Sequence, residues 1–238
     1  MSDVSIANEE SKSPLHLVLG ELIGLWLLAN AGYYLILPAL GFDLSYNSAP
    51  ILIALYFLLW AGVALFYYRN IFTRWLTVEH RIWVHIVWSL GFAALIWGLL
   101  YEFAQLPILT GIRLAPYTDI LFATSWYFLP KSAEVLVQQI LITVLVLDLS
   151  YRFHSFKKVV LSYMACFGGA HVILFLLNGT PTPYAVLMTT GAVLSSLVFP
   201  YFILRVKEGF VYTYTIHLVF YIVLAMLLHA WPPPGYIV

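Results

Sequence analysis

The run Lys131–Leu149, KSAEVLVQQILITVLVLDL, places Glu134, Gln138 and Gln139 among apolar residues. A helix needs about 20 such residues to cross the hydrocarbon core of a membrane, so we expect this run to span one. An unpaired carboxylate at the bilayer centre costs on the order of 3 kcal/mol, and intramembrane acidic residues usually have a function. Glu134 is therefore the first candidate functional residue.

The composition agrees with a membrane protein. The chain is 63% hydrophobic and only 9% charged, whereas a soluble domain carries roughly 25% charged residues. The formal net charge is zero, so nothing indicates a nucleic-acid partner. A single cysteine, Cys166, excludes an internal disulfide and a metal site with several thiolate ligands.

Seven apolar runs are long enough to span the bilayer, which predicts an all-α polytopic membrane helical bundle. The expected spans are Leu15–Leu37, Pro50–Tyr68, Ile82–Phe103, Lys131–Leu149, Lys157–Leu177, Tyr184–Leu204 and Phe210–Trp231. Residues 15–231 would form a single transmembrane domain. It would lie between a disordered cytoplasmic tail at residues 1–14 and a short tail at residues 232–238.

One apolar stretch, Ile120–Leu129, is too short to span. It is expected to be an interfacial helix, a re-entrant segment or an early extension of the fourth span.

The basic residues alternate between the two sides of these spans. One side receives Lys12, Arg69, Arg74, Arg81, Arg152, Lys157, Lys158, Arg205 and Lys207, and the other receives Arg113 and Lys131. Cytoplasmic loops carry the excess of Lys and Arg. This pattern predicts a cytoplasmic N-terminus and a C-terminus outside. At the cytoplasmic end, Asp148 precedes Arg152 by four residues, the spacing of a helix-surface ion pair.

Three groups of polar residues share helix faces, because residues four apart lie one above the other. Glu134 and Gln138 form the first group. Phe167 and His171 form the second, with Gly168-Gly169 between them allowing another helix to approach closely. The third group consists of Thr213, His217 and Tyr221.

These groups resemble, in order, the motifs of the CAAX protease and bacteriocin-processing (CPBP, or Abi) family of intramembrane proteases. That family shows EExxxR, FxxxH and HxxxN or a related third motif, each on its own helix. Here the matching stretches are EVLVQQ at Glu134–Gln139, FGGAH at Phe167–His171 and HLVFY at His217–Tyr221. The second motif matches fully, and Tyr221 stands where Asn is frequent.

The first motif is degenerate. With Glu134 at the first glutamate, Val135 occupies the second and Gln139 the arginine position. With Glu134 at the second glutamate, Ala133 occupies the first and Gln138 the arginine position. The first register is preferred because it keeps the family's catalytic carboxylate.

The resemblance implies an intramembrane endopeptidase that cuts a membrane-anchored protein or peptide. Glu134 would activate the water, His171 would orient it, and His217 with the Tyr221 hydroxyl would face the oxyanion. Gln138, Gln139, Phe167 and Thr213 would line the cavity. We expect no cofactor; the alternative is a zinc ion held by Glu134, His171 and His217.

Other interpretations of the same residues remain open. A non-catalytic binding or transport protein would use these polar groups to line a proton or solute path. Alternatively, Glu134 lies near the start of a helix because the helix dipole favours a negative charge there, and its side chain extends to the membrane–water interface. A haem site is disfavoured, because His171 and His217 differ in expected depth by about 10 Å on the helical rise.

Overall fold

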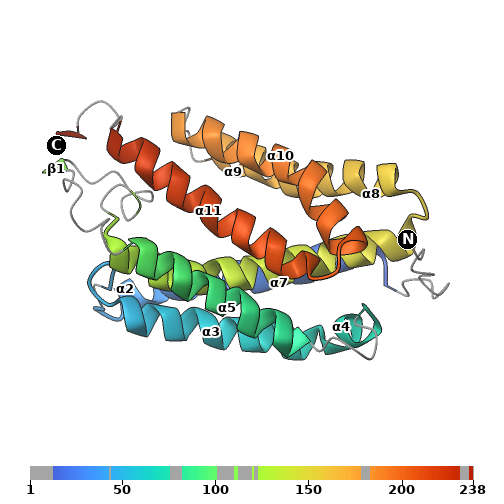
Figure 1. The fold of residues 1–238 in the computed structure, drawn as a ribbon, viewed down its shortest axis with the longest axis horizontal. Helices are drawn as coiled ribbons and strands as arrows, with labels where there is room; N and C mark the ends of the chain where they lie inside the picture. The colour runs from blue at the N-terminus through green and yellow to red at the C-terminus, as the bar shows by residue number, and fades with distance from the viewer. Residues whose placement is uncertain are drawn as a thin grey trace. The chain divides into compact units, whose positions relative to one another are not determined.

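The computed structural model describes residues 13–42, 44–75, 82–100, 110–111, 120, 123–177, 183–230 and 236–237. Almost all of these residues are helical (Figure 1). In chain order, the elements are α1 (Leu15–Ala31), the π-helix η1 (Gly32–Ile36), α2 (Leu37–Ala39), α3 (Pro50–Tyr67), α4 (Arg69–Trp75), α5 (Ile82–Leu99), β1 (Thr110–Gly111), the 3-10 turn η3 (Ser125–Tyr127), α7 (Phe128–Arg152), α8 (Phe156–Tyr163), the π-helix η4 (Met164–Gly168), α9 (Gly169–Leu177), α10 (Pro183–Arg205), α11 (Gly209–Ala230) and β2 (Tyr236–Ile237).

The expected all-α membrane bundle is confirmed. Among the described residues, 6 helical segments are long and apolar enough to cross a membrane. The expected span Ile82–Phe103 corresponds to α5, whose apolar run Trp83–Gly98 is shorter than the other six. The chain is therefore a multi-pass membrane protein.

The second half of the stretch Ile120–Leu129 belongs to the fourth span. Ser125–Tyr127 form η3, and α7 follows directly at Phe128. For residues 125–129, the expectation that fits is an early extension of the fourth span. The tail at residues 1–12 lies outside the described residues. Within the C-terminal tail, β2 pairs antiparallel with β1.

α7 is the most buried of the six apolar segments. Of its most apolar window, 94% of residues are buried, compared with 17–56% for the other five. A helix of mixed polarity is tolerated at such a position only when its polar groups find partners, because a buried unpaired polar group is costly. The contacts of α7 therefore indicate where the functional polar groups lie.

Backbone contacts divide the chain into two compact units. The first unit runs up to Ile23 and includes Ile142–Thr213, and the second comprises Gly24–Leu141 and the chain from Tyr214 onward. α1, α7 and α11 each contribute to both units. The single transmembrane domain expected from the sequence stays a prediction.

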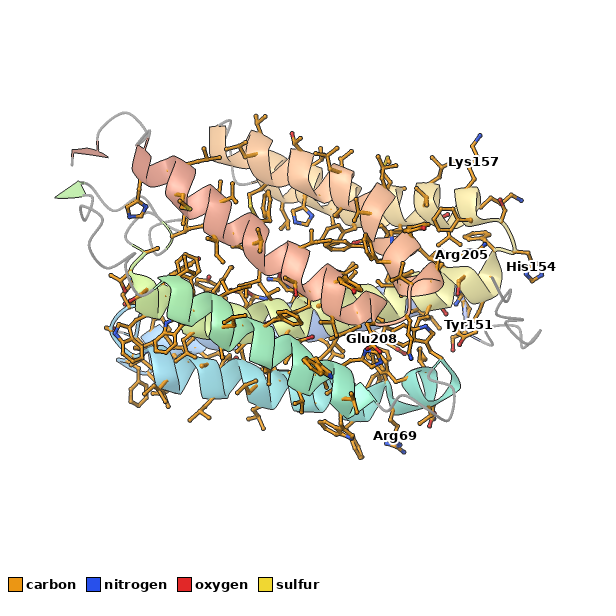
Figure 2. The ribbon with its side chains drawn as sticks, viewed as in Figure 1. Arg69, Tyr151, His154, Lys157, Arg205 and Glu208 are labelled. Carbon is orange, nitrogen blue, oxygen red and sulfur yellow. The ribbon has the colours of Figure 1, made fainter. Side chains whose placement is uncertain are left out.

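In the first unit, α8, η4 and α9 pack against α10. The C-terminal end of α7 carries the expected ion pair, in which Arg152 donates to Asp148 at 2.6 Å. Arg152 also donates to the Ser13 carbonyl at 2.5 Å. Figure 2 labels five side chains at the end of this unit where α7 and α10 end and α8 and α11 begin: Tyr151, His154, Lys157, Arg205 and Glu208.

In the second unit, aromatic hydroxyl and indole groups tie the helices together. Tyr56 on α3 donates to the Ala29 carbonyl of α1 at 2.7 Å. Trp97 on α5 donates to the Ser125 carbonyl of η3 at 2.8 Å. Tyr214 on α11 donates to the Ser132 carbonyl of α7 at 3.1 Å. The last of these bonds joins α11 to the N-terminal part of α7, which carries the candidate site.

Candidate functional site

Glu134 lies on α7 in the second unit, and only 6% of its surface is exposed. Its Oε2 accepts hydrogen bonds from the Tyr46 hydroxyl at 2.7 Å and from the Lys131 ammonium at 2.7 Å. Its Oε1 accepts one from the Gln138 amide at 2.8 Å. The carboxylate thus has an opposite charge and two neutral donors, which offset the cost of its burial.

The helical spacing of α7 produces two of these contacts. Lys131 precedes Glu134 by three residues and Gln138 follows it by four, so all three side chains share one face. Lys131 lies in the first turn of α7, where the positive end of the helix dipole disfavours a cation. Its ion pair with Glu134 compensates for this placement.

Lys131 and Gln138 also connect Glu134 to α11. The Lys131 Nζ lies 3.8 Å from the centroid of the Tyr221 ring, a cation–π contact. The Gln138 side chain is hydrogen-bonded to the Tyr221 side chain. We call Tyr46, Lys131, Glu134, Gln138 and Tyr221 the Glu134 cluster.

His217 lies beside this cluster. Its ring stacks on Tyr221, with centroids 5.6 Å apart and planes at 24°. The shared face expected for His217 and Tyr221 on one helix is thus present. The second unit therefore brings Glu134 and Gln138 of the first motif together with His217 and Tyr221 of the third.

Tyr46 comes from the connection between α2 and α3 and is only 1% exposed. Its ring contacts Tyr33, Phe57 and Tyr127, with centroids 5.3, 6.2 and 5.3 Å away. Burial, together with the charge of Glu134 beside it, raises the pKa of Tyr46 well above its ordinary value. Tyr46 therefore remains a protonated donor to the carboxylate.

Among the described residues, Glu134 accepts three hydrogen bonds from side chains. A carboxylate offers about four acceptor positions. Tyr46 and Lys131 use the two on Oε2, while Gln138 uses one on Oε1. The position that the described residues leave unused is on Oε1, the oxygen bonded to Gln138. One water molecule could donate to it.

His171 and Phe167 lie in the first unit, around the π-helix η4. The His171 Nδ1 is 2.8 Å from the Phe167 carbonyl oxygen, and the two rings meet edge to face at 4.7 Å. A carbonyl can only accept, so Nδ1 carries the proton and Nε2 is left as an acceptor. Phe167 stacks in turn on Tyr163 at 5.3 Å. π-Helical turns such as η4 are frequent at functional sites.

The other two candidate cavity residues are buried. The Thr213 hydroxyl donates within its own helix, to the carbonyls of Gly209 and Phe210 at 2.9 and 3.0 Å. Gln139 is fully buried. It follows Glu134 by five residues and so points about 140° away around α7, whereas Gln138 is the glutamine bonded to Glu134.

Sequence reasoning missed two members of the Glu134 cluster. The sequence analysis places Lys131 among the basic residues of the outer side, although its position three residues before Glu134 indicates an ion pair with that residue. Nothing in the sequence marks Tyr46, which is separated from Glu134 by 88 positions.

Within the described ranges, no three His, Cys, Asp or Glu side chains are placed so that they could hold a metal ion. The chemistry of Glu134, His171 and His217 suits zinc, but the Lys131 ammonium at 2.7 Å from Glu134 would repel a divalent cation.

The sequence matches no protein-family model, and comparisons with curated proteins and with solved structures found no match. The arguments for a function therefore rest on the residues and their geometry.

Proposed function

We propose that this chain is an intramembrane endopeptidase of the CPBP type that uses a glutamate-activated water. The observation that supports it most is that the contacts of Glu134 with the described residues use one acceptor position on Oε1, the one bonded to Gln138, and leave the other unused. A carboxylate acting as a general base needs a free lone pair directed at the water and a donor for the oxyanion close by. In this proposal, Glu134 supplies the lone pair, and Tyr221, whose ring contacts Lys131 beside Glu134, supplies the donor.

In this proposal, a water bound to Oε1 attacks the carbonyl carbon of the scissile peptide bond as Glu134 takes its proton. His217 and the Tyr221 hydroxyl donate to the oxyanion, which then collapses. The C–N bond breaks, and protonated Glu134 returns its proton to the leaving nitrogen. The role expected for His171, to orient the same water, stays a prediction, because His171 belongs to the first unit and Glu134 to the second.

The proposal keeps the first register of the first motif, in which Glu134 is the first glutamate and Gln139 stands at the arginine position. Gln138, which stands there in the second register, donates a hydrogen bond to Glu134 from four residues along the same helix. The zinc-dependent alternative is less favoured, because Lys131 already compensates the charge of the carboxylate that would bind the ion.

We further propose that the N-terminus is cytoplasmic and the C-terminus outside, following the distribution of basic residues. Glu134 is six residues into α7, which is about 9 Å at 1.5 Å per residue. In that orientation it lies in the outer half of the membrane. The substrate would be a membrane-anchored protein or peptide cut near the outer face.

The test uses the purified full chain in liposomes with internally quenched peptides that carry a lipid anchor. We expect at least one peptide to be cleaved, and Glu134→Gln to lower the rate by about 100-fold or more, the usual contribution of a general base. Glu21→Gln, at an exposed position on α1, is the matched control and should retain activity. No cleavage by the natural sequence, or equal cleavage by Glu134→Gln, would overturn the proposal.

A second candidate is a non-catalytic binding or transport protein that uses the same cluster. The compensation of Glu134 by Lys131 favours it, because a charge-neutral cluster binds polar solutes without a net charge to neutralise. Under this proposal, at least one solute in a panel of small polar solutes raises the unfolding temperature of the purified chain in detergent. That shift should be absent in Glu134→Gln and present in Glu21→Gln. A panel that shifts neither protein would speak against it.

A further inference from the structure

Exposed basic residues of the first unit gather at one end of the helical pair that α8–η4–α9 forms with α10. Residues 159–204, which make up most of this pair, contain no Asp, Glu, Lys or Arg. Lys157 and Lys158 lie at the start of α8, while Arg205 ends α10 and Lys207 follows it. All four of these basic side chains are exposed. We call them the basic rim.

The helical pair is antiparallel, which brings the two parts of the basic rim to the same level. α10 follows α9 in the chain and packs along α8, η4 and α9 (Figure 1). A Cβ added at Gly168 would lie 3.3 Å from a methyl carbon of Val193, so these two positions face each other. Lys157 precedes Gly168, and Arg205 follows Val193, by about three helical turns each. The two cations therefore lie at the same end of the pair, where Figure 2 labels them.

Few acidic groups compensate the charge of the basic rim. Asp148, at the end of α7, is already bonded to Arg152 at 2.6 Å. Among the described residues of the first unit, the other carboxylate at this end is Glu208, in the turn between α10 and α11. The three lysines of the basic rim form no ion pair within the part of the chain that the structure describes. This end of the unit therefore carries an excess of positive charge, which favours an anionic partner.

Exposed apolar side chains continue from the basic rim along the same helix faces. Leu161 follows Lys157 by four residues on α8 and is 53% exposed. On α10, Tyr201 and Leu197 precede Arg205 by four and eight residues, and they are 49% and 56% exposed. Residues four apart lie one above the other on a helix. Each cation therefore stands at the end of an apolar stripe, an arrangement that matches the anionic phosphate and the acyl chain of a phospholipid.

We propose that the basic rim binds the phosphate group of an anionic phospholipid, whose acyl chain lies along Tyr201 and Leu197. The ammonium and guanidinium groups donate charge-assisted hydrogen bonds to the phosphate oxygens. Basic residues beside membrane helices favour anionic lipids by about fivefold each. In the proposed orientation, this end of the chain faces the cytoplasm. The basic rim belongs to the first unit and the Glu134 cluster to the second, so lipid binding does not depend on the endopeptidase function.

The test is native mass spectrometry of the purified full chain in detergent, titrated with phosphatidylglycerol, which is anionic, and with phosphatidylcholine, which is zwitterionic. We expect the natural sequence to bind phosphatidylglycerol at least tenfold more tightly than phosphatidylcholine. Lys157→Gln and Arg205→Gln should each weaken the binding of phosphatidylglycerol by about fivefold and leave that of phosphatidylcholine unchanged. Lys157→Arg and Arg205→Lys keep the charge and should bind both lipids as the natural sequence does.

Arg69→Gln is the matched control, because it removes one exposed cation from the second unit. It should change the affinity for phosphatidylglycerol by less than about twofold. Equal binding of the two phospholipids by the natural sequence, or an equal effect of Arg69→Gln and Arg205→Gln, would overturn the proposal.

A further titration distinguishes a lipid from a free phosphate. Glycerol 1-phosphate carries the phosphate without acyl chains, and we expect it to bind at least 100-fold more weakly than phosphatidylglycerol. Binding of glycerol 1-phosphate as tight as that of phosphatidylglycerol would overturn the lipid as the ligand and assign the basic rim to soluble phosphate compounds.

Discussion

Glu134 illustrates how a carboxylate is kept within an apolar bundle. The Coulomb attraction of a buried pair seldom exceeds the cost of removing both ions from water. Its pairing with Lys131 is supplemented by donors from Tyr46 and Gln138, so three of the roughly four acceptor positions of the carboxylate have partners among the described residues. Removing one charge of such a buried pair should lower the free energy of unfolding more than removing both charges.

A double-mutant cycle tests this asymmetry. Lys131→Met and Glu134→Gln should each lower the free energy of unfolding by about 3–5 kcal/mol, because each leaves one buried charge alone. The double variant should lose much less than the sum, because no charge remains unpaired.

The cycle is measured by denaturant unfolding in detergent micelles. Lys157→Met is the matched control at an exposed position on α8, where about 0.5 kcal/mol or less is expected. Additive losses in the double variant would mean that Lys131 and Glu134 are not energetically coupled.

Tyr46 gives a prediction about alkaline pH. Tyr46→Phe removes the hydroxyl that donates to Glu134 while keeping the ring, and should cost about 1–3 kcal/mol at pH 8. The folded-state pKa of Tyr46 is raised above the unfolded value. Its stabilising contribution is therefore complete below about pH 10 and is lost as the pH rises through the folded pKa.

The natural chain should accordingly lose stability faster than Tyr46→Phe above pH 10, by up to about 1.4 kcal/mol per pH unit. Denaturant unfolding in detergent at pH 8, 10 and 11 measures the difference between the two proteins. If the difference in free energy of unfolding between the two proteins stays constant or grows over this pH range, the raised pKa of Tyr46 is contradicted.

At the scale of elements, the segment α8–η4–α9 depends on a close approach to α10. A Cβ added at Gly168 would lie 3.3 Å from a methyl carbon of Val193 on α10, whereas nothing lies within 4 Å of a Cβ at Gly169. The sequence assigned close packing to both glycines, and only Gly168 has such a neighbour. The π-helical turn η4 ends at Gly168 and is followed by the helical turn that presents His171.

These two glycines form a matched pair for mutation. Gly169→Ala should stabilise the helix by up to about 1 kcal/mol, the usual preference for alanine. Gly168→Ala should be less stable than Gly169→Ala by about 1 kcal/mol or more, because the added methyl crowds Val193. Thermal unfolding in detergent compares the two variants. Equal stability would show that α10 moves away without cost.

For the whole molecule, the distribution of basic residues predicts the orientation in the membrane. In a Cys166→Ser background, Ser48→Cys should react with a membrane-impermeant maleimide in intact cells, because it lies in the connection between α2 and α3. Ser155→Cys, between α7 and α8, should react only after the cells are opened. Both serines are exposed, so burial does not distinguish them. The reverse pattern would invert the proposed topology.

The sequence by itself determined the class of fold and the positions of the helices. Apolar runs of about 20 residues can satisfy their backbone groups in a bilayer only as helices, so length and composition suffice. Contacts within one helix could also be predicted from the sequence, because the spacing of four residues alone places Gln138 beside Glu134, His171 beside Phe167 and Arg152 beside Asp148.

Only the tertiary structure decided what the Glu134 carboxylate meets from other helices. Tyr46 reaches it across 88 positions, and Tyr221 lies over the ammonium that pairs with it. Such contacts depend on which helices pack together and on their rotation, and an apolar run carries little information about either. The sequence therefore identified Glu134 as the important residue, while the fold determined that a lysine and a distant tyrosine hold it.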